Sequence, residues 1–207
     1  MPETSARVLS IQSHVVSGYV GNKSAVFPMQ LLGIEVDFIN SVQFSNHTGY
    51  KAFKGQILTE NDLTDLVDGL SANDIDVYSH LLTGYIGSES FLKNIIKVVQ
   101  HLKQKNPGLV YGENKEKYCL EIPKLPIAFT GSGDLFAALI LSWMHISNSN
   151  LKQSLENTIA SLHAVLKRTL EATQGKPLTA FNTELKLLQS KRDIEEPIVS
   201  FKATRVL

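Results

Sequence analysis

Strand-like and helix-like segments alternate along the first half of the chain, and this alternation constrains the fold more than any other feature. Apolar-rich runs predict strands at residues 7–13, 34–40, 76–85 and 108–111. Helical spacing of apolar residues predicts helices between them, at residues 24–33, 60–70 and 88–106. Alternation of this kind is typical of βαβ units around a mostly parallel sheet, so the predicted fold class is α/β.

Polar loops follow three of these predicted strands. They span residues 13–24, 41–54 and 83–88 and are rich in glycine, serine or asparagine. The carboxyl ends of parallel strands share one edge of a sheet, so these loops should gather at that edge. Open α/β sheets bind their ligands there, and we expect a substrate to lie among these loops.

The alternation breaks after Tyr111. Residues 112–129 supply charged residues and one short strand instead of the next strand–helix unit. Two helices are then predicted, a nearly all-apolar one at 134–145 and an amphipathic one at 150–172, followed by a strand-like tail at residues 197–207. A helix that is apolar on all sides is expected to be buried on all sides.

The composition indicates a globular protein without a strong electrostatic field. Hydrophobic residues make up 43% and charged residues 19%, and 20 basic residues balance 20 acidic ones. This balance argues against nucleic-acid and membrane partners and suits small-molecule chemistry.

The single cysteine, Cys119, excludes an internal disulfide and is interpreted as a small apolar filler in a strand rather than a nucleophile. With no signal-peptide pattern and no membrane-spanning run, we expect one cytoplasmic domain over residues 1–207.

The stretch "FTGSGDLFAA" offers two interpretations. Gly131, Ser132 and Gly133 could point successive backbone N–H groups into one concavity, which the start of a helix would complete as an anion site. The alternative is an ordinary turn in which Asp134 caps the following helix. The stretch is neither a Walker A loop nor a dinucleotide fingerprint, since it lacks the residues that each requires.

Asp134 could also act as a base in the first interpretation. Its reference pKa of about 3.9 is too low to deprotonate an alcohol in the ground state. In the loose transition state of phosphoryl transfer, however, the nucleophile gives up its proton late, so an oriented carboxylate is sufficient.

A second group of residues suits an aromatic ligand. Phe44 and Tyr85 offer flat faces, and Ser13, His47 and Thr48 offer hydrogen bonds to the polar rim of a ring. The alternative is a loop whose polar residues cap its own turns. The histidines are scattered without an i,i+4 pair or a cysteine cluster, so no residue is assigned to a metal.

Several segments resemble the pyridoxal kinase family of animals, within the ribokinase-like superfamily. They are "RVLSIQSHVVSGYVGNKSAVFP", "NSVQFSNHTGY", "LTGY", "TGSGDLFAALILSW" and "LQSKRDIEEP", in family order. The resemblance implies a three-layer α/β sandwich around a central, mostly parallel sheet, and a homodimer. It also implies ATP-dependent phosphorylation of the 5′-hydroxyl of pyridoxal, pyridoxine and pyridoxamine, with Mg²⁺ or another divalent cation and with K⁺ as a monovalent activator.

The same resemblance implies a role for each matching residue. Asp134 would be the base that accepts the hydroxyl proton. The backbone of Gly131, Ser132 and Gly133 would bind the transferred phosphoryl group, and Ser132 replaces a threonine that is common in the family. The vitamer-binding residues would be Ser13 and Thr48, which bond the polar atoms of the pyridine, and Val20, Phe44, His47 and Tyr85, which line the ring pocket.

The chain also departs from the family pattern. Between about residues 111 and 117 it lacks on the order of a hundred residues, although its length is still that of an ordinary domain. Missing with them are a D-P-V segment, an N-x-x-E element and the strands of the adenine side. We therefore expect part of the sheet to be absent and apolar helix faces to be exposed. The alternative function is a catalytically silent form that binds pyridoxal or pairs with full-length subunits. A hydroxymethylpyrimidine kinase fits "QFSNHTGY" less well.

Overall fold

A central sheet of mostly parallel strands organises the computed structural model, which describes residues 6–109 and 116–206. Its strand order is β3-β2-β1-β4. β1 pairs in parallel with both of its neighbours, whereas β3 is antiparallel to β2. The strands are β1 (Arg7–Val15), β2 (Glu35–Phe44), β3 (Gly55–Ile57) and β4 (His80–Thr83). The predicted α/β class with a mostly parallel sheet is confirmed.

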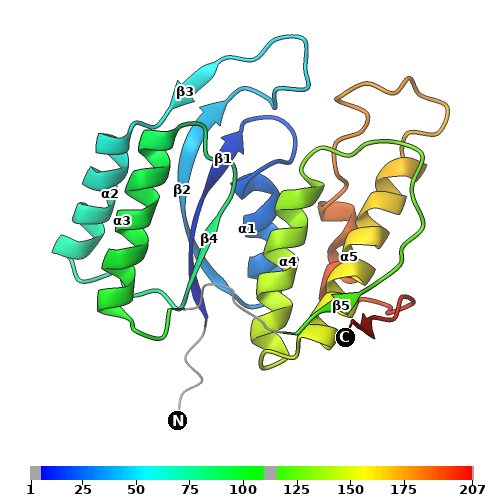
Figure 1. Ribbon diagram of the computed structural model, residues 1–207. Coiled ribbons are helices and arrows are strands. Elements are labelled where there is room, and N and C mark those ends of the chain that lie inside the picture. The colour runs from blue at the N-terminus through cyan, green and yellow to red at the C-terminus, as the bar shows by residue number, and fades with distance from the viewer. Residues whose placement is uncertain (1–5, 110–115, 207) are drawn as a thin grey trace.

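Helices cover both faces of this sheet and complete three layers (Figure 1). One face carries α2 (Glu60–Ala72) and α3 (Glu89–Lys105). The other carries α1 (Asn22–Leu31) and α4 (Ser132–Ile146), and α5 (Leu151–Glu171) packs against α4. A short 3₁₀ turn, η1 (Leu188–Ser190), and α6 (Lys191–Glu195) follow near the C-terminus. None of the helices among the described residues is long and apolar enough to cross a membrane.

The side chains of β1 alternate between two cores. Leu9 and Ile11 join the cluster under α2 and α3, whereas Val8 joins the cluster formed with α1 and α4. All three are almost fully buried. A strand that is apolar on both faces must lie inside a sheet covered on both sides, which explains why β1 holds the centre of the fold.

Two predicted strand ends differ from the structure. β2 runs four residues beyond its predicted end, because β1 continues beside it to Val15 and β3 pairs with its last residues. The expected loop over residues 41–54 therefore begins as strand. β4 is shorter than the predicted 76–85 at both ends, and just before it the carbonyl of Tyr78 accepts a hydrogen bond of 2.8 Å from Asn106 Nδ2.

Both later strand-like segments predicted from the sequence form strands, but each strand is only two residues long. β5 (Tyr118–Cys119) and β6 (Thr204–Arg205) pair only with each other, antiparallel and outside the main sheet. Cys119 is exposed there, so it is not an apolar filler. Of the strand predicted at residues 108–111, Gly108 lies in a turn, Leu109 has no regular structure, and the rest falls outside the described residues.

The apolar helix α4 is buried on one side rather than on all sides. Leu135, Ala138 and Leu139 are fully buried against α1 and α5, but Ile146 is 44% exposed. Within the described part of the chain the main sheet ends at β4, so no further strand covers the remaining side of α4. This agrees with the expectation that part of the sheet is absent.

Candidate active site

A cavity of about 690 Å³ opens at the carboxyl ends of β1, β2 and β4. All the predicted vitamer-binding residues line it: Ser13, Val20, Phe44, His47, Thr48 and Tyr85. A register shift in β1 between Gln12 and Ser13 changes the pairing of β1 with β2 at this point. Bulges of this kind re-aim side chains beside functional sites, and here the shift falls at a cavity residue.

The cavity has an aromatic wall that the sequence analysis described only in part. The rings of Phe44 and Phe53 lie 5.1 Å apart at an interplanar angle of 48°. Tyr85 is 71% exposed and lines the same cavity. Phe53 was missed, although an aromatic residue in a polar loop that also holds Phe44 was a usable signal. Other lining residues that were not singled out include Val15, Val42, Ile57, Leu58, Phe91 and Thr130.

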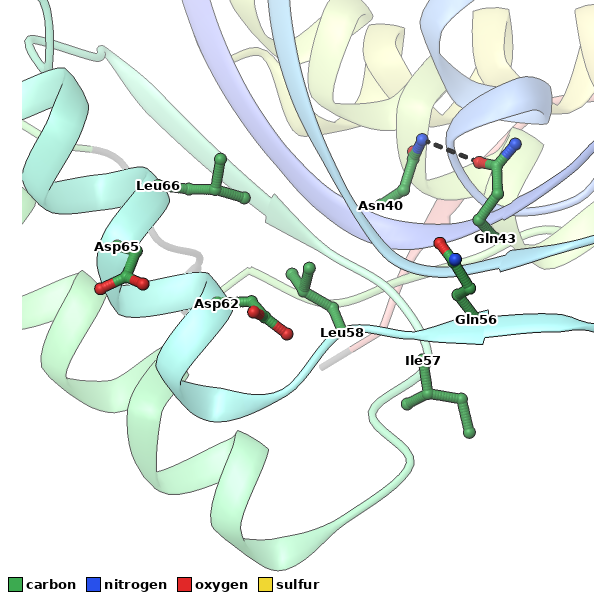
Figure 2. Close-up of a pocket in the computed structure, with 8 residues that line it drawn as sticks. All are labelled: Asn40, Gln43, Gln56, Ile57, Leu58, Asp62, Asp65 and Leu66. Atoms are coloured by element: carbon green, nitrogen blue, oxygen red, sulfur yellow. Dashed lines mark hydrogen bonds between the residues drawn. The ribbon is translucent and has the colours of Figure 1, made fainter.

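A second, more polar pocket of about 580 Å³ adjoins this cavity and shares Ile57 and Leu58 with it. Figure 2 shows the amide side chains of Asn40, Gln43 and Gln56 grouped on one side of it. Asn40 Nδ2 donates to Gln43 Oε1 at 3.2 Å. None of the predicted site residues lines this pocket, so the candidate active site is the larger cavity.

Asp134 lies in the first turn of α4, with its carboxylate turned toward the loop after β1. Its Oδ2 accepts a hydrogen bond of 2.7 Å from the backbone N–H of Gly21. Burial raises the pKa of Asp134, and the bond from Gly21 opposes that rise in part. Because α4 begins at Ser132 and its N-cap is Gly131, the interpretation of Asp134 as a helix cap is wrong.

The glycine loop packs closely against the same segment. Gly131 has φ +81°, and a Cβ there would lie 2.0 Å from the carbonyl oxygen of Tyr19. Ser24 Oγ donates to the Gly131 carbonyl at 3.1 Å, and Ser132 Oγ donates to the Phe129 carbonyl at 3.1 Å. One serine of α1 and one of the loop itself therefore hold the loop backbone. The backbone N–H groups of the loop lie at the first turn of α4, where helices bind anions.

A buried carboxylate that the sequence analysis did not single out joins two loops of the cavity. Glu184 accepts hydrogen bonds from the Tyr19 backbone N–H at 2.9 Å and from the Tyr50 hydroxyl at 3.0 Å. His47 Nε2 lies 3.3 Å from its Oε1. No motif marked Glu184, because its partners come from loops more than a hundred residues away in sequence.

An apolar pocket of about 400 Å³ lies on the other side of the glycine loop, between residues 122–129 and α5. It is lined by Ile122, Pro123, Lys124, Leu125, Ile127, Phe129, Ile159, Leu162, His163 and Leu166. Phe129 lines this pocket and Thr130 lines the larger cavity. Among the described residues, no group of three or more His, Cys, Asp or Glu could hold a metal ion.

A kinase for a small hydroxyl compound must hold its acceptor and an incoming phosphoryl group close to one carboxylate. Two pockets lined by the adjacent residues Phe129 and Thr130, on the loop that leads to Asp134, offer such an arrangement, which is typical of α/β small-molecule kinases. No family model matches the sequence. Curated pyridoxal kinases, however, align with nearly all of it. The chain belongs to the pyridoxal kinase family.

The similarity extends over almost the full length of these relatives. Pyridoxal kinase of Arabidopsis thaliana is 36% identical over 297 positions, which cover 99% of this chain and 96% of that protein. The human enzyme is 33% identical over 309 positions, with coverages of 98% and 99%. Since the chain has only 207 residues, these relatives carry residues without a counterpart here, in agreement with the expected internal deletion.

Solved structures confirm the fold. Pyridoxal kinase from Trypanosoma brucei matches with a TM-score of 0.86 at 21% identity, covering 98% of this chain and 100% of that one. The enzyme from Leishmania donovani in complex with ADP and ginkgotoxin matches with a TM-score of 0.83 at 22% identity and the same coverages.

Proposed function

We propose that the chain transfers the γ-phosphoryl group of ATP to the 5′-hydroxyl of pyridoxal, and of pyridoxine and pyridoxamine, and so forms pyridoxal 5′-phosphate. The observation that carries this proposal is the hydrogen bond from the Gly21 N–H to the Asp134 carboxylate. Gly21 directly follows Val20, which lines the cavity, so the bond holds the carboxylate beside the cavity wall. The family membership supports it, and related structures contain ADP with pyridoxine or pyridoxamine.

The cavity suits a flat pyridine with polar substituents. Phe44, Phe53 and Val20 supply apolar surface for the ring faces. We assign Ser13 and Thr48 as hydrogen-bonding partners of the polar ring atoms, with Tyr85 at the side of the cavity that is most exposed.

The reaction forms a bond between the 5′-oxygen and the γ-phosphorus and breaks the bond from that phosphorus to the β–γ bridging oxygen. Asp134 accepts the hydroxyl proton, and the bond from Gly21 fixes the direction of its carboxylate. Backbone N–H groups of Gly131, Ser132 and Gly133, at the positive end of the α4 dipole, stabilise the phosphoryl oxygens. The divalent cation is part of the MgATP substrate.

We assign the adenine of ATP to the apolar pocket between residues 122–129 and α5. A nucleotide there would extend its phosphates past Phe129 toward Thr130 and the first turn of α4. The strands of the adenine side known from the family pattern are missing from this chain, and this pocket offers a remaining surface for a flat base. Phe129 and Leu166 supply the apolar contacts.

A silent form is the second candidate, and one observation favours it. The relatives contain residues that this chain lacks, and β4 has no further neighbour in the main sheet of the described residues. The test is to incubate the purified chain with pyridoxal and MgATP and to measure pyridoxal 5′-phosphate. Turnover that disappears in Asp134→Asn supports the kinase; pyridoxal binding without turnover by the unaltered chain supports the silent form.

We also propose a homodimer in the cytosol, a single domain over residues 1–207 and activation by K⁺, on the strength of the family resemblance. An exposed cysteine that forms no disulfide suits a reducing compartment. Sedimentation of the purified chain tests the dimer, and turnover in potassium compared with sodium salts tests the cation.

A further inference from the structure

Glu184 is a buried carboxylate on which hydrogen-bond donors from two separate loops converge. The donors are the Tyr19 backbone N–H and the Tyr50 hydroxyl, and Nε2 of the His47 ring lies 3.3 Å from the same carboxylate. The side chains of Glu184 and His47 are both only 7% exposed. A buried charge without partners is strongly destabilising, so the convergence of these donors is what allows a carboxylate at this position.

The close approach of Glu184 to the loop after β1 depends on a glycine. A Cβ at Gly18 would lie 2.2 Å from Glu184 Oε1, and the φ of Gly18 is +94°. On the other side, Leu185 and Leu187 are fully buried in the cluster with α4 and α5, and they anchor the segment that carries Glu184. The carboxylate is therefore fixed to the helical layer and reaches into the loop after β1.

Two carboxylates hold alternate amides of this loop. Glu184 accepts from the N–H of Tyr19, and Asp134 accepts from the N–H of Gly21. Val20, which lies between them, is 9% exposed and lines the cavity. Since a short loop held at two such points has little freedom, a change at Glu184 alters both the cavity wall and the donor that orients Asp134.

The loop after β2, which contains His47 and Tyr50, is held through side chains. The N–H of Gly49 donates to His47 Nδ1 at 3.1 Å, which leaves the ring proton on Nε2, facing Glu184. Burial, together with the bond to Glu184, raises the pKa of Tyr50 to about 12, so its hydroxyl remains a donor at neutral pH. Thr48, the assigned ring partner, lies between these two anchors in the chain.

We infer that Glu184 is a positioning residue for the pyridoxal site. It is not among the described residues that line the cavity, and it acts through Tyr19 and Gly21 on Asp134 and through His47 and Tyr50 on Thr48. This inference rests on the proposed function of the same cavity. The glutamate joins the C-terminal segment to the loops after β1 and β2.

The kinetic test is the Glu184→Gln variant. An amide of the same shape places two N–H donors where the Tyr19 and Tyr50 donors and the His47 ring already converge, so at least one favourable contact is lost. Bonds to charged groups are among the stronger ones, and we expect the KM for pyridoxal to rise about tenfold with a lower kcat. The KM for ATP should stay within about twofold, because the nucleotide pocket does not involve these loops. Glu171→Gln is the matched control, because it makes the same change from carboxylate to amide at an exposed position on α5. It should leave kcat and the KM values for pyridoxal and ATP unchanged.

A second measurement does not depend on turnover. Amide hydrogen exchange should become about tenfold faster at Tyr19 and Gly21 in Glu184→Gln, while amides in the centre of β1 keep their rates. Pyridoxal binding measured by calorimetry should weaken in parallel. Unchanged pyridoxal affinity together with unchanged exchange at Gly21 would overturn the inference. If the unaltered chain shows no turnover, the proposed function fails, yet exchange and binding still decide the role of Glu184.

Tyr50→Phe keeps the test decisive if Glu184→Gln does not fold. It removes one donor and leaves the buried carboxylate with the Tyr19 bond and the His47 contact. A weaker pyridoxal affinity with an unchanged melting temperature supports the positioning role, and an affinity equal to that of the unaltered chain contradicts it.

Discussion

Phe129 and Thr130 are adjacent in the chain, yet they line two different pockets. Phe129 belongs to the apolar pocket beside α5, and Thr130 belongs to the cavity at the end of the sheet. The glycine loop that follows leads directly into α4 and Asp134. In the proposed function, the phosphoryl group is transferred beside the first turn of this helix, where the positive end of its dipole lies.

The two pockets should respond separately to substitution. Leu166→Ala removes apolar surface from the pocket beside α5, and we expect the KM for ATP to rise roughly tenfold, as for the loss of a hydrophobic contact in a binding pocket. The KM for pyridoxal should change little. Phe53→Ala is the reciprocal variant and should weaken only pyridoxal binding. Steady-state kinetics with each substrate varied in turn measure both constants, and a variant that weakens both substrates equally contradicts the assignment.

Asp134→Asn tests the base. The amide oxygen can still accept the hydrogen bond from Gly21, so the loop should keep its position. The proton acceptor is lost, and we expect kcat to fall by at least about a hundredfold. Pyridoxal affinity, measured by calorimetry, should remain within a few-fold of its original value. A kcat within tenfold of the unaltered chain would show that another group takes the proton.

The sequence predicted the sheet and the cavity residues because both depend on local signals. Alternating periodicity located β1, β2 and most of the helices. The carboxyl ends of the strands brought Ser13 of β1, Phe44 of β2 and Tyr85, which follows β4, to one cavity. Where a strand ends depends on its neighbours. β2 lengthens because β3 pairs with its end, and the segment before β4 binds the side chain of Asn106 through the Tyr78 carbonyl.

Contacts between distant segments could not be predicted in the same way. Glu184 lies in a C-terminal segment without a motif, and its role depends on loops that only the folded chain brings near. Similarly, Asp134 fits the helix-cap pattern in sequence, but the helix starts two residues earlier than predicted and its carboxylate meets Gly21 instead.

The same aspartate should reduce the stability of the folded chain at neutral pH. Burial raises its pKa above the ordinary value of 3.8, so the folded state holds the proton more tightly than the unfolded state. Between the ordinary and the raised pKa, the free energy of unfolding therefore falls as pH rises, and above the raised pKa the loss is complete. Asp134→Asn should melt at a higher temperature than the unaltered chain at pH 7.

Thermal melts of both proteins over a series of pH values measure this difference. The gap between the two melting temperatures should narrow as the pH falls below the ordinary pKa of 3.8, where the carboxyl is protonated in both states. A gap that stays constant with pH would assign the stabilisation to packing instead. Functional groups that reduce stability are common at active sites, and this result would add a thermodynamic reason to assign Asp134 to catalysis.

Gly131 is the position at which the loop tolerates no side chain. Its φ is +81°, and a Cβ would lie 2.0 Å from the backbone oxygen of Tyr19, which cannot move without disturbing the loop held by Asp134 and Glu184. Gly131→Ala should lower the free energy of unfolding by more than about 1 kcal/mol and abolish most of the activity. Gly69→Ala is the matched control within α2, where a Cβ meets nothing within 4 Å, and it should stabilise by about 0.5–1 kcal/mol. Urea unfolding of both variants measures the two changes, and equal stability of Gly131→Ala and the unaltered chain would mean that the loop can retreat from Tyr19.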